Sequence, residues 1–87
     1  MPLANCTQLE QLYMDSDSIS DITALSKLTN LILLDLSFNQ ITDIAPLVNN
    51  SGLSQGDAIS LNGNPLDSIS INQYIPQLKT RGVVVFY

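Results

Sequence analysis

Hydrophobic and polar positions repeat along this chain with a period close to 22 residues. The clearest copy of the pattern is LILLDLSFNQITDI at residues 31–44, in which aliphatic residues alternate with polar ones around a single asparagine, Asn39. The same order of residues occurs 22 positions earlier, at 9–22, and 25 positions later, at 56–69. Self-similarity at roughly 20 to 29 residues, with the spacing L-x-x-L-x-L-x-x-N-x-L, is the signature of leucine-rich repeats. The pattern therefore predicts an α/β leucine-rich repeat solenoid, with short parallel strands on a concave face and turns, 3-10 or short α helices on the convex face.

The repeat divides the 87 residues, which are few enough for a single domain, into five segments. A partial repeat covers 1–8, further repeats cover 9–30, 31–55 and 56–69, and a C-terminal helix and strand that cap the array cover 70–87. The repeat at 31–55 is three residues longer than the one before it. Its additional residues are Asn, Gly and Ser, which favour a turn, and Leu53 is expected to attach this turn to the core.

The C-terminal segment changes from the repeat to a helical pattern. Ser70 and Gln73 fit a capping box at the start of the helix. The apolar positions expected on one face of this helix are Ile71, Ile75 and Leu78. Pro76 lacks a backbone N–H, so the helix is expected to kink or to split into two pieces.

Alternation within each predicted strand separates residues that face the core from residues that face outward. Residues 83–87 are expected to form the last strand, with Tyr87 directed inward. In the repeat at 56–69, the last position of the pattern is Ile69, which aligns with Ile22 and Ile44 of the two preceding repeats.

A column of asparagine side chains is expected beside the core. The Asn39 amide can donate to backbone carbonyls and accept from backbone amides of neighbouring repeats, and Asn64 continues the column. A buried hydrogen bond left unmade there would cost about 1 to 3 kcal/mol. Asp17 occupies the same column in the repeat at 9–30, but an ionised carboxylate accepts without donating. That repeat is therefore expected to be looser, or closer to water, at this point.

Two segments, SDSISDI and FNQITDI, together with the L-x-x-L-x-L strands, resemble the internalin-like class of bacterial leucine-rich repeat proteins, whose repeats have this period of 22 residues. The tail GDAISLNGNPLDSISINQYIPQLKTRGVVVFY resembles the closing unit at the C-terminal end of such arrays. The resemblance implies a non-catalytic protein that binds other proteins or macromolecules through its concave strands. The chain departs from the family pattern at Asp17 in place of Asn, at Gly56 in place of the leading Leu, and at its start, where the strand half of a repeat is missing.

Residues that would form a catalytic, metal or cofactor site do not occur in a suitable arrangement. The chain has no histidine, and its one cysteine, Cys6, stands in a leucine column, where an inert buried thiol is the simpler interpretation. Asp15, Asp17 and Asp21 superficially suggest a calcium loop. An EF-hand loop, however, needs Gly at position six and Glu at position twelve, and this chain has serine at both. We therefore expect no enzyme activity, no metal and no cofactor.

The net charge and the length of the apolar runs limit which partners and which cellular location we expect. The net charge is −5 with only three basic residues. Nucleic acid and anionic membranes favour surfaces dense in Lys and Arg, so neither is expected as a partner. The chain shows no signal peptide and no run near the roughly 18 apolar residues of a membrane span. This favours a cytoplasmic location, and a surface location is the alternative if the chain is cut from a longer protein.

The outward strand positions form the first candidate binding surface, for a protein partner of unknown identity. Its expected members are the apolar anchors Tyr13, Leu33, Phe38 and Phe86, the acidic Asp15 and Asp35, and the polar Ser37, Ser60 and Asn62. Aromatic residues gathered in a patch are typical of protein interfaces. The alternative is that the surface is too short and that scattered exposed apolar residues have no function. This assignment of faces predicts that Asn39→Ala destabilises the protein and that Asp35→Ala does not.

The N-terminal edge is the second candidate surface. Terminal repeats of solenoids normally need a polar cap, and none precedes the apolar positions of the first repeats. These positions are Leu3, Cys6, Leu9 and Leu12. A second copy of the chain, related by a two-fold axis, could cover them. A homodimer through this edge is therefore the other interpretation, and it is compatible with a binding surface on the strands.

Overall fold

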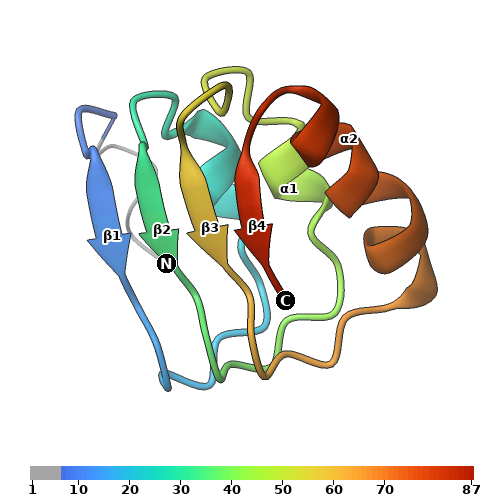
Figure 1. Ribbon diagram of the computed structural model, residues 1–87. Helices are drawn as coiled ribbons and strands as arrows, with labels where there is room; N and C mark the ends of the chain where they lie inside the picture. Colours follow the sequence, from blue (N-terminus) through green and yellow to red (C-terminus); the bar gives the residue numbers. More distant parts are fainter. Residues whose placement is uncertain (1–6) are drawn as a thin grey trace.

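The computed structural model, which describes residues 7–87, is an α/β fold built on one four-stranded parallel sheet (Figure 1). The strands lie in the sheet in chain order and are β1 (Gln11–Tyr13), β2 (Leu33–Asp35), β3 (Ala58–Ser60) and β4 (Val84–Phe86). The helical segments are the 3-10 helix η1 (Thr23–Lys27), α1 (Ala45–Val48), the π-helical turn η2 (Ser70–Tyr74) and α2 (Ile75–Thr80). Figure 1 shows α1 and α2 on one face of this sheet.

The period of the sequence determines how the strands pair. Leu12 of β1 pairs with Leu34 of β2, Leu34 pairs with Ile59 of β3, and Ile59 pairs with Val85 of β4. The step from Leu12 to Leu34 is one sequence period, and the extra residues of 31–55 form a loop without shifting the register of β3. Because side chains alternate along a strand, these central residues all point to the helical side.

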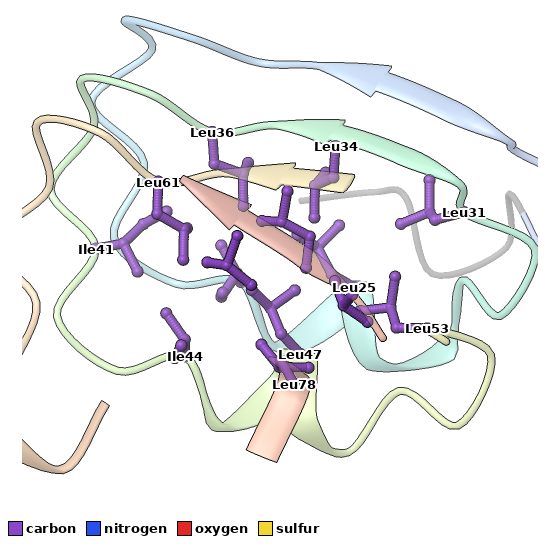
Figure 2. Packing of buried hydrophobic residues seen from close by; sticks show 14 of the residues in the cluster. Leu25, Leu31, Leu34, Leu36, Ile41, Ile44, Leu47, Leu53, Leu61 and Leu78 are labelled. Carbon is purple, nitrogen blue, oxygen red and sulfur yellow. The ribbon is translucent and has the colours of Figure 1, made fainter. Parts of the chain in front are cut away.

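A single cluster of aliphatic side chains fills the space between the sheet and the helices (Figure 2). Leu34 and Leu36 from β2 and the turn after it meet Leu25, Leu47 and Leu78 from the helical segments. All of these side chains are 1% exposed or less. At about 0.8 kcal/mol for each buried CH₂ group, this shared core is the main stabilising contribution in the fold.

The asparagine column has the hydrogen bonds that the sequence predicts. The Asn39 amide donates to the carbonyls of Met14 (2.8 Å) and Leu36 (2.9 Å). Its Oδ1 accepts the backbone N–H groups of Asp17 (2.8 Å) and Ile19 (2.9 Å). One side chain therefore links residues from the first and the second copy of the pattern, which confirms the prediction for Asn39.

Asn64 continues the column in the third copy of the pattern. Its amide donates to the carbonyls of Leu36 (2.8 Å) and Leu61 (3.0 Å), and its Oδ1 accepts the N–H of Ile41 (3.1 Å). Asp17, at the matching place in the first copy, is exposed, and so are Ser16 and Ser18 on either side of it. The expectation that this part of the chain lies closer to water is also confirmed.

The longer turn after α1 packs closely on the preceding copy of the pattern. Leu53 is buried, as expected. Asn50 is also fully buried, which the repeat pattern did not predict. Its amide donates to the carbonyls of Leu25 (2.8 Å) and Leu28 (3.0 Å), and its Oδ1 accepts the N–H of Gly52 (2.9 Å). Asn50 follows Leu28 by 22 residues, so a satisfied amide replaces an aliphatic side chain in that column.

The start of the C-terminal helix corrects the predicted capping box. Asp67, and not the pair Ser70 and Gln73, caps the helix, because the Asp67 carboxylate accepts the N–H of Ser70 at 2.8 Å. Ser70 then takes the buried position that Ile22 and Ile44 occupy in the preceding copies, and Ile69, which aligns with them in the sequence, is 50% exposed. The Ser70 hydroxyl satisfies this site by donating to the Thr42 carbonyl (3.1 Å) and accepting the N–H of Ile44 (3.1 Å). The helix is displaced by one residue from the simple alignment of the copies.

The remainder of this segment also differs from the pattern in detail. Ile75 and Leu78 are buried as predicted, but Ile71 is 39% exposed. The π-helical turn η2 runs directly into α2, with the N–H of Ile75 bonded to the Ser70 carbonyl, so Pro76 is accommodated by a wider turn and not by a break. Tyr87 lies beyond the end of β4 and is exposed, because the strand ends at Phe86 and no longer holds the next residue in alternation.

Candidate functional site

The face of the sheet that points away from the helices carries most of the predicted binding residues. Strand register arranges its side chains in two rows across the sheet. One row, which we call the aliphatic row, begins with Gln11 and continues with Leu33, Ala58 and Val84. The other, which we call the aromatic row, has Tyr13 and Phe86 at its ends and Asp35 and Ser60 between them. We call these eight residues the open face. Tyr13 is 59% exposed and Phe86 is 54% exposed, whereas Asp35 and Ser60 between them are half-buried.

The polar centre of the open face is tied into the turn that follows β2. The Asp35 carboxylate accepts the N–H of Ser37 at 3.0 Å through one of its oxygens. The Ser37 hydroxyl lies 2.6 Å from the Ser60 hydroxyl, and the Asn62 amide donates to the Ser60 hydroxyl at 3.4 Å. Ser37 is buried, although the alternation predicted it on the outward side. Asp35 is therefore not a free surface carboxylate, and the expectation that Asp35→Ala costs no stability is revised to a small loss.

Phe38 lies in the turn beyond β2 and has an unusual backbone. Its φ angle is 59°, which places a bulky residue in the left-handed region. Residues in that region cost about 1 to 2 kcal/mol unless they are glycine. Gly63 occupies the matching turn after β3 with a φ of 78°, and a Cβ there would meet the Phe38 ring at 2.4 Å. The ring therefore covers Gly63, and Phe38 remains 65% exposed.

Strained residues with exposed side chains are often found at binding sites, because the fold holds them in place at a cost in stability. The sequence identified Phe38 as an apolar anchor but gave no sign of its backbone conformation. The one available signal is positional, since the glycine that would relieve the strain stands in the next copy of the pattern, at Gly63.

The three basic residues all belong to the helical side of the fold, whereas acidic residues occur on both sides. Asp35 is the only charged residue of the open face, and Asp15 follows β1 two residues after Tyr13. The basic side chains belong to the helical side: Lys27 ends η1, and Lys79 of α2 lies 5.1 Å from the centre of the Tyr87 ring. Arg81, just after α2, donates to the carbonyls of Val48 (2.6 Å) and Asn50 (3.2 Å), where a cation complements the C-terminal end of α1.

The N-terminal edge falls only partly within residues 7–87. Leu3 and Cys6 lie outside the described residues. Leu9 and Leu12 are half-buried and pack against the core, and β1 is an edge strand of the sheet. The two described members of the predicted self-association edge thus lie together on one side of the sheet.

No group of three or more potential metal-ligating side chains is present in residues 7–87. None of the helices in this part of the chain combines the length and the hydrophobicity that crossing a bilayer requires. No family model matches the chain, and no curated protein matches its sequence. Functional inference therefore depends on the geometry of the open face, the turn that holds Phe38, and the edge at β1.

Proposed function

We propose that this chain is a leucine-rich repeat solenoid of the internalin-like class and that it binds a protein partner, without catalysis, through the open face. The strand order, the in-register pairing and the shared asparagine column support the solenoid assignment. The observation that carries the binding proposal is the aromatic row, in which two exposed aromatic side chains flank a polar centre across four strands.

The dimensions of the open face suit a short segment of a partner. Neighbouring strands are about 4.8 Å apart, so the row from Tyr13 to Phe86 spans roughly 14 Å. Large aromatic side chains dominate the energetics of protein interfaces because they bury much apolar area with few rotatable bonds. Val84 adds a further exposed aliphatic side chain beside Phe86. A partner loop or peptide that covers these three residues would remove most of the exposed apolar area of the sheet.

A selection experiment tests this proposal even though the partner is unidentified. A displayed library of random peptides is panned against the wild-type chain, and each selected peptide is then tested against Tyr13→Ala and Phe86→Ala. The matched control is Ile71→Ala, which removes an exposed aliphatic side chain on the helical side. Peptides that lose binding with the first two variants and retain it with the control support the proposal. Peptides that bind all variants equally, or an absence of binders, would reject it.

Phe38 lies outside the open face, in the turn beyond β2, and it tests whether the binding surface extends to this turn. Phe38→Gly removes the exposed ring and also relieves the left-handed strain, so the protein should be at least as stable as the wild type. We expect weaker peptide binding together with an unchanged or raised melting temperature. Loss of stability in Phe38→Gly would mean that the ring acts by covering Gly63, and that its role is structural.

A second candidate function is self-association through the edge at β1. The observation that favours it is the half-burial of Leu9, Leu12, Met14 and Ile19, whose equivalents in the second copy are fully buried. Light scattering over about a hundredfold concentration range would measure the solution mass. A dimer that is lost in Leu12→Lys and kept in Gln8→Lys, with circular dichroism confirming the fold of both, would support this function. A monomer at every concentration would reject it.

A further inference from the structure

We propose that the partner of the open face presents an arginine or lysine side chain to Asp35 and Tyr13, with apolar side chains on either side of it. This inference rests on the proposed function of the open face. It identifies the chemical class of the partner as a basic and apolar protein segment.

Asp35 lies inside the aromatic row and not at either end of it. It lies in the second of four strands, between Tyr13 on β1 and Ser60 on β3. A partner that covers both Tyr13 and Phe86 must therefore also cover Asp35 and remove its water. An ionised carboxylate that loses water without gaining a partner is strongly unfavourable in a protein interface. The partner must supply a donor at this point, and a cationic donor compensates the charge best.

The Asp35 carboxylate can accept more hydrogen bonds than it already has. One carboxylate oxygen accepts the N–H of Ser37, while a carboxylate offers about four acceptor positions in all. The chain's own cations are directed elsewhere: Arg81 bonds to carbonyls behind the sheet, Lys79 lies over Tyr87, and Lys27 ends η1. Asp35 thus keeps acceptor capacity that the described part of the chain does not use with a basic side chain.

An exposed aromatic residue lies next to Asp35 on the open face. The Tyr13 ring is exposed and comes from the adjacent register position, where a cation could contact both the carboxylate and the ring face. A guanidinium group suits such a site well, because it is planar and can stack on a ring while it donates to a carboxylate. Asp15 lies two residues after Tyr13 in the chain and adds negative potential at the same end of the sheet.

Apolar side chains lie beside Asp35 on the open face. Leu33, Ala58 and Val84 form a continuous aliphatic row beside it, and Phe86 closes the aromatic row. A partner residue on either side of the basic one therefore meets apolar surface. The face should reject acidic segments, because they would place like charges together, and it should bind uniformly charged basic segments poorly.

The peptides selected on the wild-type chain test this composition directly. We expect them to be enriched in Arg or Lys next to apolar residues. The best peptide is then synthesised in two versions, one with arginine and one with citrulline, which keeps the shape but lacks the charge. Fluorescence anisotropy of the labelled peptides gives their Kd values for the wild-type chain and for Asp35→Asn. The amide oxygen of the new side chain can still accept the Ser37 N–H, so the turn is preserved.

We expect Asp35→Asn to weaken the arginine peptide by roughly tenfold or more and to leave the citrulline peptide nearly unchanged. The control is Asp43→Asn, which makes the same change in net charge on the helical side, where Asp43 accepts the N–H of Ala45. This control should affect neither peptide. An arginine peptide that binds Asp35→Asn and wild type equally would overturn the inference.

The remaining outcomes separate the inference from the proposed function. Peptides without basic residues that still require Tyr13 and Phe86 would overturn the inference and leave the proposed function standing. Peptides that require neither aromatic residue would overturn both. Displacement of the peptide by unlabelled chain, with a matching dimer in light scattering, would assign the face to a second copy of this protein and also overturn the inference.

Discussion

The first two copies of the pattern, residues 9–30 and 31–55, have the same order of apolar and polar residues but different degrees of burial. Leu12, Met14 and Ile19 are half-buried, whereas Leu34, Leu36 and Ile41 at the equivalent positions are fully buried. The second copy has a neighbouring strand on both sides, whereas within residues 7–87 β1 pairs with β2 alone. The difference shows that the pattern selects which side chains point inward, while neighbouring segments determine how much water they lose.

Polar groups show the same contrast. In the second copy, Asn39 is buried and makes hydrogen bonds to the first copy and to the turn of its own copy. In the first copy, Asp17 is exposed, and its backbone N–H is held by the Asn39 side chain. The first copy therefore depends on the second for its order, and the reverse dependence is weaker. Four predictions test this asymmetry.

The largest effect is expected for core truncation in the second copy. Leu36→Ala removes a fully buried side chain and should lower the free energy of unfolding by about 2 to 5 kcal/mol. Met14→Ala, at the equivalent position of the first copy, should cost clearly less, because Met14 is already half exposed to water. Urea denaturation of both variants measures the two losses. Equal losses would show that the first copy is as well packed as the second.

The next effect concerns the asparagine column. Asn39→Ala leaves buried backbone groups of Met14 and Leu36 without one of their partners and releases the N–H groups of Asp17 and Ile19. Each buried group that stays unpaired costs about 1 to 3 kcal/mol. Hydrogen exchange should become faster at Asp17 and Ile19 before it changes elsewhere. The control, Asp17→Ala, should stay within about 0.5 kcal/mol of wild type, and a larger loss would contradict the contrast.

A smaller effect is expected where the longer turn meets the first copy. A Cβ at Gly52 would lie 1.8 Å from the Thr29 carbonyl oxygen, so Gly52→Ala forces the turn away from residues 9–30. Such overpacking typically costs about 1 to 3 kcal/mol. Ser51→Ala, at an exposed neighbouring position, is the control and should be nearly neutral. A stable Gly52→Ala protein with an unchanged urea midpoint would show that this contact does not hold the two copies together.

The smallest effect concerns pH and the start of η1. The Asp21 carboxylate accepts the hydroxyl and the N–H of Thr23, and these hydrogen bonds lower the pKa of Asp21 below its ordinary value. A depressed pKa means that the ionised form is favoured in the folded protein. Its contribution to stability is therefore present above the ordinary value near 3.9 and is lost as the pH falls through the lower folded value.

Melting temperatures of wild type and Asp21→Asn measure this contribution. The variant should melt slightly earlier at pH 6, and the difference should disappear in strong acid, where both side chains are uncharged. A difference that stays constant from neutral to acid pH would mean that the charge on Asp21 has no part in the turn.

Several features of the fold follow from the sequence because they depend on spacing alone. The 22-residue period brings Leu12 beside Leu34, and alternation directs both toward the helices. Asn39 and Asn64 stand at positions where an amide side chain can donate to carbonyls and accept from N–H groups at once, so their hydrogen bonds could be predicted. Tyr13, Phe86 and Asp35 are brought to one face by the same register.

Other features depended on groups that are distant in the sequence, and spacing could not predict them. Ser70 displaced Ile69 from the buried column because Asp67 caps the helix and because the Thr42 carbonyl and the Ile44 N–H need a polar partner. Asn50 could enter a leucine column only because two carbonyls of the preceding copy accept its amide.

The sequence by itself determined the repeat, the inward direction of the central residue of each strand and the aromatic row of the open face. The tertiary structure alone decided the half-burial of the first copy, the bond that ties Asp35 into its turn and the packing of the Phe38 ring over Gly63. The physical reason is that periodicity specifies direction, whereas burial, hydrogen-bond partners and strain depend on the atoms that neighbouring segments bring within a few ångströms.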